Sequence, residues 1–242
     1  PEEIDLSIVM PCLNEENTVG LCITDALNFI NKYNINGEVI VVDNASVDGS
    51  QAVARANGAR IVYEDRRGYG NAIRTGIKES RGRVIIIGDC DTTYDFLNLE
   101  KLYEPLISGQ CDMVIGNRYE GGIQKGGMPL SHWLGVKALS LIARIRFHTD
   151  VYDFHCGLRG ISKDAAGRLE FKTTGMEFAT EMIAVAARED LRIVQVPVVL
   201  RKCVYNRSSK LNTISDGFRH LSYIIKRRSC LLYTSDAADE RS

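Results

Sequence analysis

Short runs of branched apolar residues alternate with helical stretches through the first half of this chain, and this alternation narrows the possible folds more than any other feature. Each run is short and apolar enough for burial on both faces. A repeated order of strand, helix and strand predicts an α/β fold, with a mostly parallel, Rossmann-like central sheet and helices on both of its faces. The expected strands are Leu6–Met10, Val39–Asp43, Arg60–Tyr63, Val84–Gly88 and Met113–Gly116, and the expected helices are Glu16–Tyr33, Ser50–Asn57 and Asn71–Ser80.

The second half departs from this pattern after Gly116, where a glycine-rich loop precedes a long helix predicted over Leu130–Phe147. That helix is amphipathic and basic, so it suits either a membrane surface or packing on the protein's own core. We also expect a helix at Glu177–Arg188, strands at Arg192–Pro197 and Val198–Val204, and a last helix at Ile214–Lys226. The predicted division is one domain over 1–211, a basic amphipathic helix within 212–230 and a disordered or artefactual tail over 231–242.

The composition excludes several classes of protein. Charged residues make up 25% of the 242 residues and the net charge is -1, which gives no basic surface for nucleic acid. The seven cysteines form no C-x-x-C pair, which argues against a structural zinc site or a disulfide framework and favours the reducing cytoplasm. No stretch approaches the roughly 18 apolar residues of a membrane span, so we expect at most peripheral contact with the cytoplasmic face of a membrane.

Three polar clusters follow expected strands: Pro11–Glu15, Asp43–Gly49 and Asp89–Asp91. In open parallel sheets, ligands bind beyond the carboxyl ends of the strands, where these clusters would meet. Two carboxylates one residue apart, Asp89 and Asp91, suit a hard divalent cation and a phosphate-bearing ligand, although a simple aspartate turn is the alternative. Asp43 could accept hydrogen bonds from a ribose or base, Asp48 could hold its loop through backbone amides, and Asn14 could serve only as a helix N-cap.

Six motifs in fixed order resemble the family 2 glycosyltransferases, and among them the polyprenyl-phosphate sugar synthases. The resemblance covers about residues 4–227 and rests on P-x-x-N-E (Pro11 to Glu15), D-N-A-S-x-D-G (Asp43 to Gly49), R-G-x-G-x-A-x-x-x-G (Arg67 to Gly76), D-x-D (Asp89, Asp91), G-N-R-Y (Gly116 to Tyr119) and D-x-x-C-G-L-R (Asp153 to Arg159). It implies a GT-A fold, a nucleoside-diphosphate sugar donor, Mg²⁺ or Mn²⁺, and inversion at the anomeric carbon.

The resemblance also assigns residues to roles. Asp89 and Asp91 would hold the metal, and Asn44 stands where many members carry a second aspartate. The nucleotide-sugar pocket would comprise Pro11, Asn14, Glu15, Asp43, Asn44, Arg67, Gly70 and Asp89.

The chemistry of the acceptor distinguishes an enzyme that acts on a lipid phosphate from one that acts on a saccharide. A phosphate monoester is already largely dianionic at neutral pH, so an enzyme acting on polyprenyl phosphate needs cations more than a general base. The predicted catalytic residues are Asp91, Asp153, Arg118 and Arg159, and the predicted phosphate and acceptor residues are Lys125, Arg201, Arg207 and Lys210. If the acceptor were a saccharide, as in the alternative of glycan synthesis, Asp153 would serve as the base.

Two other classes stay open at this point, a sugar-1-phosphate nucleotidyltransferase and a non-catalytic nucleotide-binding module. The i, i+4 pair Glu177 and Glu181 predicts charge on a helix surface or at a helix start. None of the four histidines has the spacing of a metal ligand, and Cys90 is expected to point into the core.

Overall fold

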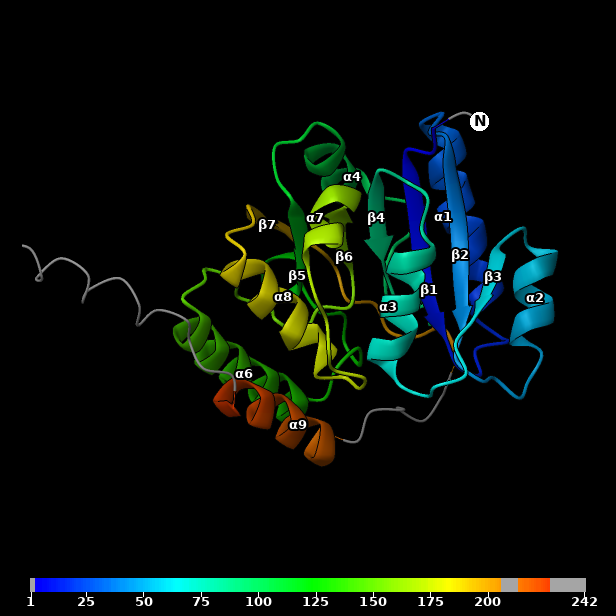
Figure 1. Cartoon of the computed structure of the whole chain (residues 1–242). Helices are drawn as coiled ribbons and strands as arrows, with labels where there is room; N and C mark the ends of the chain where they lie inside the picture. The colour runs from blue at the N-terminus through cyan, green and yellow to red at the C-terminus, as the bar shows by residue number, and fades with distance from the viewer. Residues whose placement is uncertain (1–2, 206–212, 227–242) are drawn as a thin grey trace, which may run out of the picture.

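The computed structural model describes residues 3–205 and 213–226, and it contains one seven-stranded sheet (Figure 1). The strand order is β3-β2-β1-β4-β6-β5-β7, and only β6 runs antiparallel to its neighbours. The described strands are β1 (Leu6–Cys12), β2 (Gly37–Asp43), β3 (Arg60–Tyr63), β4 (Val84–Ile87), β5 (Met113–Asn117), β6 (Arg159–Ser162) and β7 (Ile193–Pro197). The predicted α/β fold with a mostly parallel sheet is confirmed.

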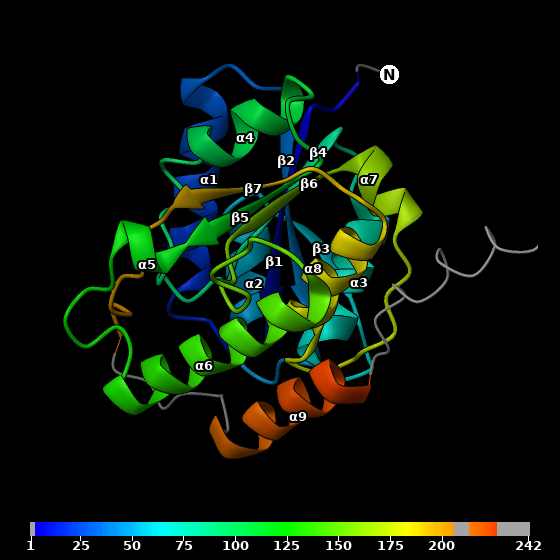
Figure 2. The ribbon, with the colours of Figure 1, turned by 90° about the vertical axis from the view of Figure 1, so that its left-hand side faces the viewer.

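Helices cover both faces of the sheet, with α1, α2 and α4 on one side and α3, α7 and α8 on the other (Figure 2). In α1 the apolar residues recur at helical spacing, and the face that they form is buried against the sheet. The described helices are α1 (Val19–Lys32), α2 (Ser50–Ala56), α3 (Tyr69–Glu79), α4 (Glu100–Ile107), α5 (Arg118–Gly121), α6 (Leu130–Phe147), α7 (Lys163–Arg168), α8 (Phe178–Arg188) and α9 (Thr213–Lys226).

Several predicted elements differ from the structure. The strand predicted at Val198–Val204 is wrong, because this run makes a single isolated bridge, from Leu200 to Ile123, and then turns away from the sheet. The sequence also gave no indication of α4, α7 and the antiparallel strand β6. Asn14 is not a helix N-cap, because α1 begins only at Val19, with Thr18 at the capping position.

The strand order reverses between β1 and β4. The chain runs outward from β1 through β2 to β3, and then returns to place β4 on the other side of β1. A crevice opens at such a switch point beyond the carboxyl ends of the two strands, and ligands bind there in open α/β sheets. The segments that follow β1 and β4 are Pro11–Glu15 and Asp89–Asp91, so the fold brings two of the predicted clusters to this crevice.

Helices α6 and α9 pack against each other at the end of the molecule where the strands reach their carboxyl ends (Figures 1 and 2). Within the described residues, every helix is too short or too polar to cross a membrane. The boundary predicted at 211/212 and the predicted tail over 231–242 lie outside the described residues, and α9 is the last described element.

Candidate active site

The Asp89–Asp91 segment leaves β4 in a tight turn that holds both carboxylates. Asp91 is 8% exposed, and its Oδ1 accepts hydrogen bonds from the Thr93 amide at 3.0 Å and from the Thr93 hydroxyl. Asp89 lies against Gly157, where an added Cβ would come within 2.3 Å of its Oδ2. Burial raises the pKa of the Tyr69 phenol, and the hydrogen bond and negative charge of Asp89 raise it further, so Tyr69 is a neutral neighbour of this carboxylate.

This pair fits a divalent cation that shares its coordination with a ligand. Mg²⁺ and Mn²⁺ take oxygen ligands, and Mg²⁺ usually binds one or two carboxylates together with substrate phosphates. Among the described residues, no group of three or more His, Cys, Asp or Glu side chains could hold a metal ion alone. The donor set is therefore incomplete without oxygens from a bound ligand, as a diphosphate would supply.

Asp43 ends β2 beside β1 and carries an unused hydrogen-bond acceptor. Its Oδ2 accepts from Gln51 Nε2 at 2.9 Å and from the Ser46 amide at 3.4 Å. Its Oδ1 is buried and has no partner within the described part of the chain. A buried, unpaired acceptor is costly unless a ligand satisfies it, so Asp43 is suited to an N–H or O–H group of a ligand, and its role in binding a nucleoside stays a prediction.

Asn44 has a structural role in this conformation, which corrects its prediction as a nucleotide-binding side chain. Its Nδ2 donates to the carbonyls of Glu64, at 2.7 Å, and Arg66, at 3.0 Å, and its Oδ1 accepts from the Gly68 amide at 2.8 Å. These bonds use both donors and one lone pair of the amide, so Asn44 fixes the path of the segment that leads into α3.

The loops after β1 and β2 are tied together through side chains. Asn14, whose φ is 52°, accepts from the Val47 amide at 2.8 Å through its Oδ1, and its own amide donates to Ser46 Oγ at 3.0 Å. The Glu15 amide donates to Ser50 Oγ at 2.7 Å. Asp48 accepts from the Ser50 and Glu16 amides, which confirms that it holds its loop through backbone amides.

The glycines before α3 give room to a protein loop, which corrects the predicted approach of a phosphate to Gly70. The Gly70 amide donates to the Thr174 carbonyl at 3.0 Å, and a Cβ at this position would lie 2.7 Å from the Thr173 carbonyl. Gly68, with φ of 140°, would place a Cβ only 2.2 Å from the Thr174 carbonyl. Arg67, between these contacts and Asn44, is exposed and stays a predicted donor ligand.

Asp153 and Arg118 form a buried ion pair. Arg118 donates from Nε and from Nη2 to the two oxygens of Asp153, both at 2.7 Å, and its amide donates to Oδ2 at 3.1 Å. The side chains of Arg118 and Asp153 are 7% and 0% exposed. A carboxylate enclosed in this way is not placed to take a proton from an acceptor, as the saccharide alternative would require, and the role of Asp153 in a transfer to a lipid phosphate stays a prediction.

The guanidinium of Arg159 also donates its hydrogen bonds to the protein's own backbone. It donates to the backbone carbonyls of Cys156, Ala179 and Phe154 at 2.6 to 2.7 Å, and the residue is 3% exposed. These bonds join β6, the Asp153–Leu158 turn and α8, so Arg159 acts in the structure as a buried brace. Its predicted contact with an acceptor is not made from this position.

Two of the predicted basic residues lie in described loops near the Asp89–Asp91 segment. The Arg201 amide donates to the Thr93 carbonyl at 2.8 Å, and its guanidinium pairs with Asp95. Lys125 is exposed in the loop before α6, and its role stays a prediction. Arg207 and Lys210 lie outside the described residues.

Further side chains complete the surroundings of the site. Cys90 is 1% exposed, which confirms that it points into the core, and its contact with the Cys12 thiol and its burial raise its pKa. Sequence reasoning missed Tyr69 and Thr93, whose contacts to Asp89 and Asp91 depend on the folded turn. His155 is half-buried beside His220, with 4.5 Å between the ring centroids.

Comparison with known proteins identifies the family. The family profile described as "Glycosyl transferase family 2" matches residues 7–169 of this chain. The chain belongs to this family. It is 36% identical over 231 residues to the low-salt glycan biosynthesis hexosyltransferase Agl6 of Haloferax volcanii, covering 95% of this chain and 55% of that protein. The chain therefore spans about half the length of this relative.

Two more comparisons agree with the family and the fold. A dolichyl-phosphate hexose transferase of Haloferax volcanii is 28% identical, over 82% of this chain and 83% of its own. The crystal structure of glucosyl-3-phosphoglycerate synthase from Mycobacterium tuberculosis, in complex with phosphoglyceric acid, superposes with a TM-score of 0.73 at 23% identity, over 92% of this chain and 79% of that chain. The protein is thus a family 2 glycosyltransferase with the GT-A fold, and the readings as a nucleotidyltransferase or a non-catalytic module are wrong.

Proposed function

We propose that this glycosyltransferase moves a hexose from a nucleoside-diphosphate sugar to a polyprenyl phosphate, with inversion and with Mg²⁺ or Mn²⁺, while bound peripherally at the cytoplasmic face of a membrane. The names of two relatives support the class of reaction, since one is a hexosyltransferase and the other a dolichyl-phosphate hexose transferase.

The observation that carries the proposal is an apolar surface beside the ligand-binding crevice. Helix α6 packs on the protein through a narrow face and exposes large apolar side chains along the opposite one. We call these residues the α6 stripe; they recur at helical spacing and comprise Leu130, Leu134, Leu141, Ile142 and Ile145, which are 43% to 71% exposed. Phe218 and Ile225 of the adjacent α9 are exposed by 68% and 66%.

Charge favours an anionic lipid surface as the occupant of this face. All the ionised residues of α6 are basic, namely Lys137, Arg144 and Arg146, and they flank the stripe. A helix with an apolar face and a basic border binds in the interfacial plane of a membrane whose cytoplasmic leaflet is negative. Exposed apolar stripes of this size are costly in water, so a membrane partner also explains why the stripe exists.

The donor would bind in the crevice between β1 and β4. Asp43 Oδ1 offers the acceptor for the nucleoside, and Asp91 lies where the diphosphate must complete a metal site. A divalent ion held there would neutralise the charge that develops on the leaving diphosphate. Thr93 holds the Asp91 carboxylate by two hydrogen bonds, so Asp91 keeps its orientation while the leaving group separates.

The state of Asp153 supports a phosphate acceptor over a saccharide. Transfer to a sugar hydroxyl requires a base at the moment of attack, whereas a phosphate monoester already carries its nucleophilic oxygen in ionised form. Asp153 is the base that the saccharide alternative requires, and both of its oxygens accept hydrogen bonds from Arg118 in a buried pair.

A transfer assay tests the proposal. Purified protein is incubated with Mn²⁺ or Mg²⁺, radiolabelled UDP-glucose or GDP-mannose, and either dolichyl phosphate or a maltose acceptor. Label is expected in the lipid fraction, lost on addition of EDTA. Label in the saccharide fraction alone would overturn the proposal in favour of glycan synthesis.

Membrane binding is tested separately with the α6 stripe. Leu134→Glu together with Ile145→Glu should abolish co-sedimentation with vesicles of phosphatidylserine and phosphatidylcholine. Leu21→Glu, at an exposed apolar position of α1, serves as the matched control and should bind as the wild type does. Equal binding of both variants would refute this surface, and dimer dissociation by the double variant would assign the stripe to a second copy of the chain.

A further inference from the structure

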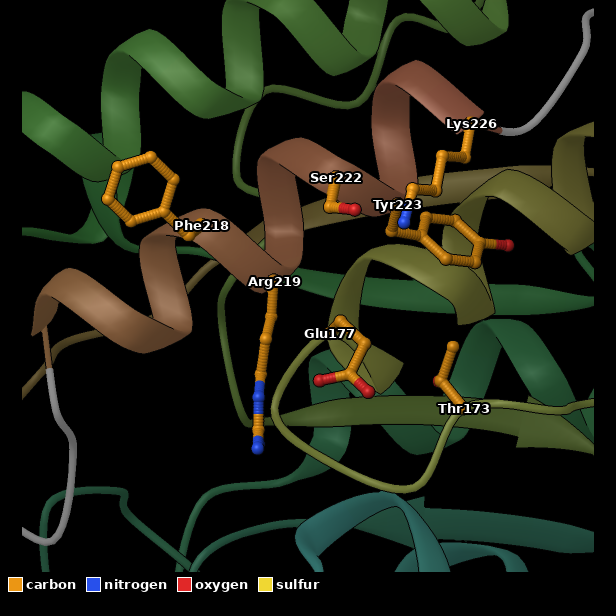
Figure 3. Close-up of a pocket in the computed structure, with 7 residues that line it drawn as sticks. All are labelled: Thr173, Glu177, Phe218, Arg219, Ser222, Tyr223 and Lys226. Carbon is orange, nitrogen blue, oxygen red and sulfur yellow. The ribbon is translucent and has the colours of Figure 1, made fainter.

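A pocket of about 510 Å³ lies between α9 and the loop that leads into α8 (Figure 3). Its volume is within the range of small-ligand sites. Arg219, Ser222 and Lys226 line it from α9, and they follow one another by three and four residues, so they share one face of the helix. Thr173 and Glu177 line it from the α8 side, and Phe218 and Tyr223 complete the lining.

The two cations of this pocket are available to an anion. Arg219 and Lys226 are exposed, and among the described residues neither has a carboxylate within ion-pair distance. Figure 3 shows Arg219 extending from α9 toward the loop that carries Glu177. Arg219, Ser222 and Lys226 bring a guanidinium, a hydroxyl and an ammonium to the lining of the pocket, and groups of these three kinds bind phosphate oxygens.

The carboxylate of Glu177 limits the kind of phosphate group that can bind in this pocket. One of its oxygens accepts from the Gly175 amide at 3.2 Å, while its Oε2 is buried without a hydrogen-bond partner in the described structure. Gly175 leaves the room for this arrangement, because a Cβ there would lie 2.6 Å from Glu177 Oε2 and 2.8 Å from Arg219 Nη1. A ligand must offer an O–H or N–H donor here, and it must not bring a second bare anion against the carboxylate.

A phosphate monoester meets this condition and a diester does not. With a second pKa of about 6, a monoester is mostly dianionic in solution at neutral pH, but beside the Glu177 carboxylate it can bind as the monoanion, which donates its one proton to Glu177 and still has an ionised oxygen to contact the cations. The diester of an ordinary phospholipid has no such proton. Phe218, at the mouth of the pocket and beside the α6 stripe, offers an apolar surface for a hydrocarbon chain.

The wall of the pocket is joined to the donor crevice by a short chain of contacts. The carboxylate of Glu181 accepts from the Lys172 and Thr173 amides and holds the loop. The next residue, Thr174, accepts from the Gly70 amide, and Tyr69 beside it contacts Asp89. The loop that forms one wall of the pocket is therefore in contact with the segment that leads to Asp89.

On this basis, and resting on the proposed function, we propose that the pocket between α9 and the loop before α8 binds the phosphate monoester of the lipid acceptor. Arg219 and Lys226 hold the phosphate, and Glu177 selects a monoester over a diester.

The test measures binding of farnesyl phosphate, a short-chain monoester that needs no membrane, by isothermal titration calorimetry. Arg219→Gln with Lys226→Gln should raise the dissociation constant at least tenfold. Lys78→Gln with Lys101→Gln removes the same charge from exposed positions of α3 and α4 and should leave it within twofold. Glu177→Gln, which offers the ligand an N–H donor, should reduce the preference for farnesyl phosphate over its methyl diester.

Each outcome decides between the two proposals. Failure of the wild type to bind farnesyl phosphate, equal binding of the monoester and diester, or an equal effect of the two double variants would overturn this site. Circular dichroism of every variant excludes a loss of folding as the cause. If farnesyl phosphate binds as expected but no sugar is transferred to any lipid phosphate, the site stands and the proposed function fails.

Discussion

The buried pair of Arg118 and Asp153 leads to a quantitative prediction, because replacing Asp153 leaves the positive charge of Arg118 in the core without a partner. Asp153→Asn keeps the shape of the side chain but removes the partner of a guanidinium that is 7% exposed. Breaking a buried ion pair in this way costs about 3–5 kcal/mol of the free energy of unfolding. For a chain of this size that corresponds to a fall in Tm of about 6–20 °C.

The matched control is the pair of Arg192 and Asp112, which has the same two-pronged geometry on the surface. Its N–O distances are 2.9 and 3.0 Å, and the Arg192 side chain is 58% exposed. Solvent screens such a pair, so Asp112→Asn should cost no more than about 1 kcal/mol. Urea denaturation followed by circular dichroism measures both variants. Equal losses for Asp153→Asn and Asp112→Asn would refute the reasoning.

A double replacement separates the stabilising role of the pair from any role in turnover. Arg118→Met with Asp153→Leu removes both charges, and buried pairs replaced by apolar residues of similar volume lose little stability. We expect this variant to unfold at a higher urea concentration than Asp153→Asn. If it also transfers sugar at the wild-type rate, Arg118 acts only in the fold; if it is stable but inactive, the guanidinium contributes to the reaction through a change in position.

Three further predictions concern the site and its surroundings. Asp91→Ala should lower metal-dependent transfer at least about 100-fold and abolish the rise in Tm that Mn²⁺ and UDP-glucose produce together, as measured by differential scanning fluorimetry. Asn44→Ala removes the partners of the Glu64 carbonyl and the Gly68 amide, while the Arg66 carbonyl still accepts from Asn71, so it should cost about 1–3 kcal/mol in urea denaturation and weaken nucleotide binding. Burial lowers the pKa of His220 to about 4 from its ordinary 6.5, so the unfolded chain takes up the proton first as the pH falls, and this group contributes a loss of stability of roughly 3 kcal/mol between pH 6.5 and 4. Burial also lowers the pKa of the adjacent His155, so His220→Gln should reduce the acid-induced loss without abolishing it, whereas His148→Asn, at an exposed histidine, should leave it unchanged.

The parallel part of the fold could be predicted because its signals are local. Val84–Ile87 is a run of branched apolar residues, and every one of them is buried in β4 as the pattern indicated. Strand β6 was not predicted, because Arg159–Ser162 contains one long apolar residue and begins with a charged one. The strands that pair with it also lie far away in the sequence. The strand prediction for Val198–Val204 was wrong for the opposite reason, since this run has the composition of a strand but forms one isolated bridge, from Leu200 to Ile123, in place of a continuous ladder.

The location of the site could be predicted from the sequence more easily than the role of each of its residues. The clusters at the strand ends meet because strand order and direction bring them together, and both could be inferred from the alternation. What a polar side chain bonds to is set by tertiary contacts. Asn44 and Asp43 are neighbours at the end of β2, yet Asn44 turns to carbonyls 20 and 22 residues away while Asp43 keeps an oxygen unpaired in the crevice.

The roles of Glu177, at the N-cap of α8, and Glu181, in the first turn of that helix, could not be predicted from the sequence either. They are one turn apart, and their spacing predicts equivalent positions on a surface. In the structure Glu181 is fully buried and accepts hydrogen bonds from two backbone amides and the Thr173 hydroxyl, which makes it the anchor of the loop before α8. Glu177, at the end of that same loop, keeps a buried oxygen turned to a pocket with two cations. Two carboxylates one helical turn apart therefore have different surroundings, which are set by the tertiary contacts of the loop before α8 and not by their spacing.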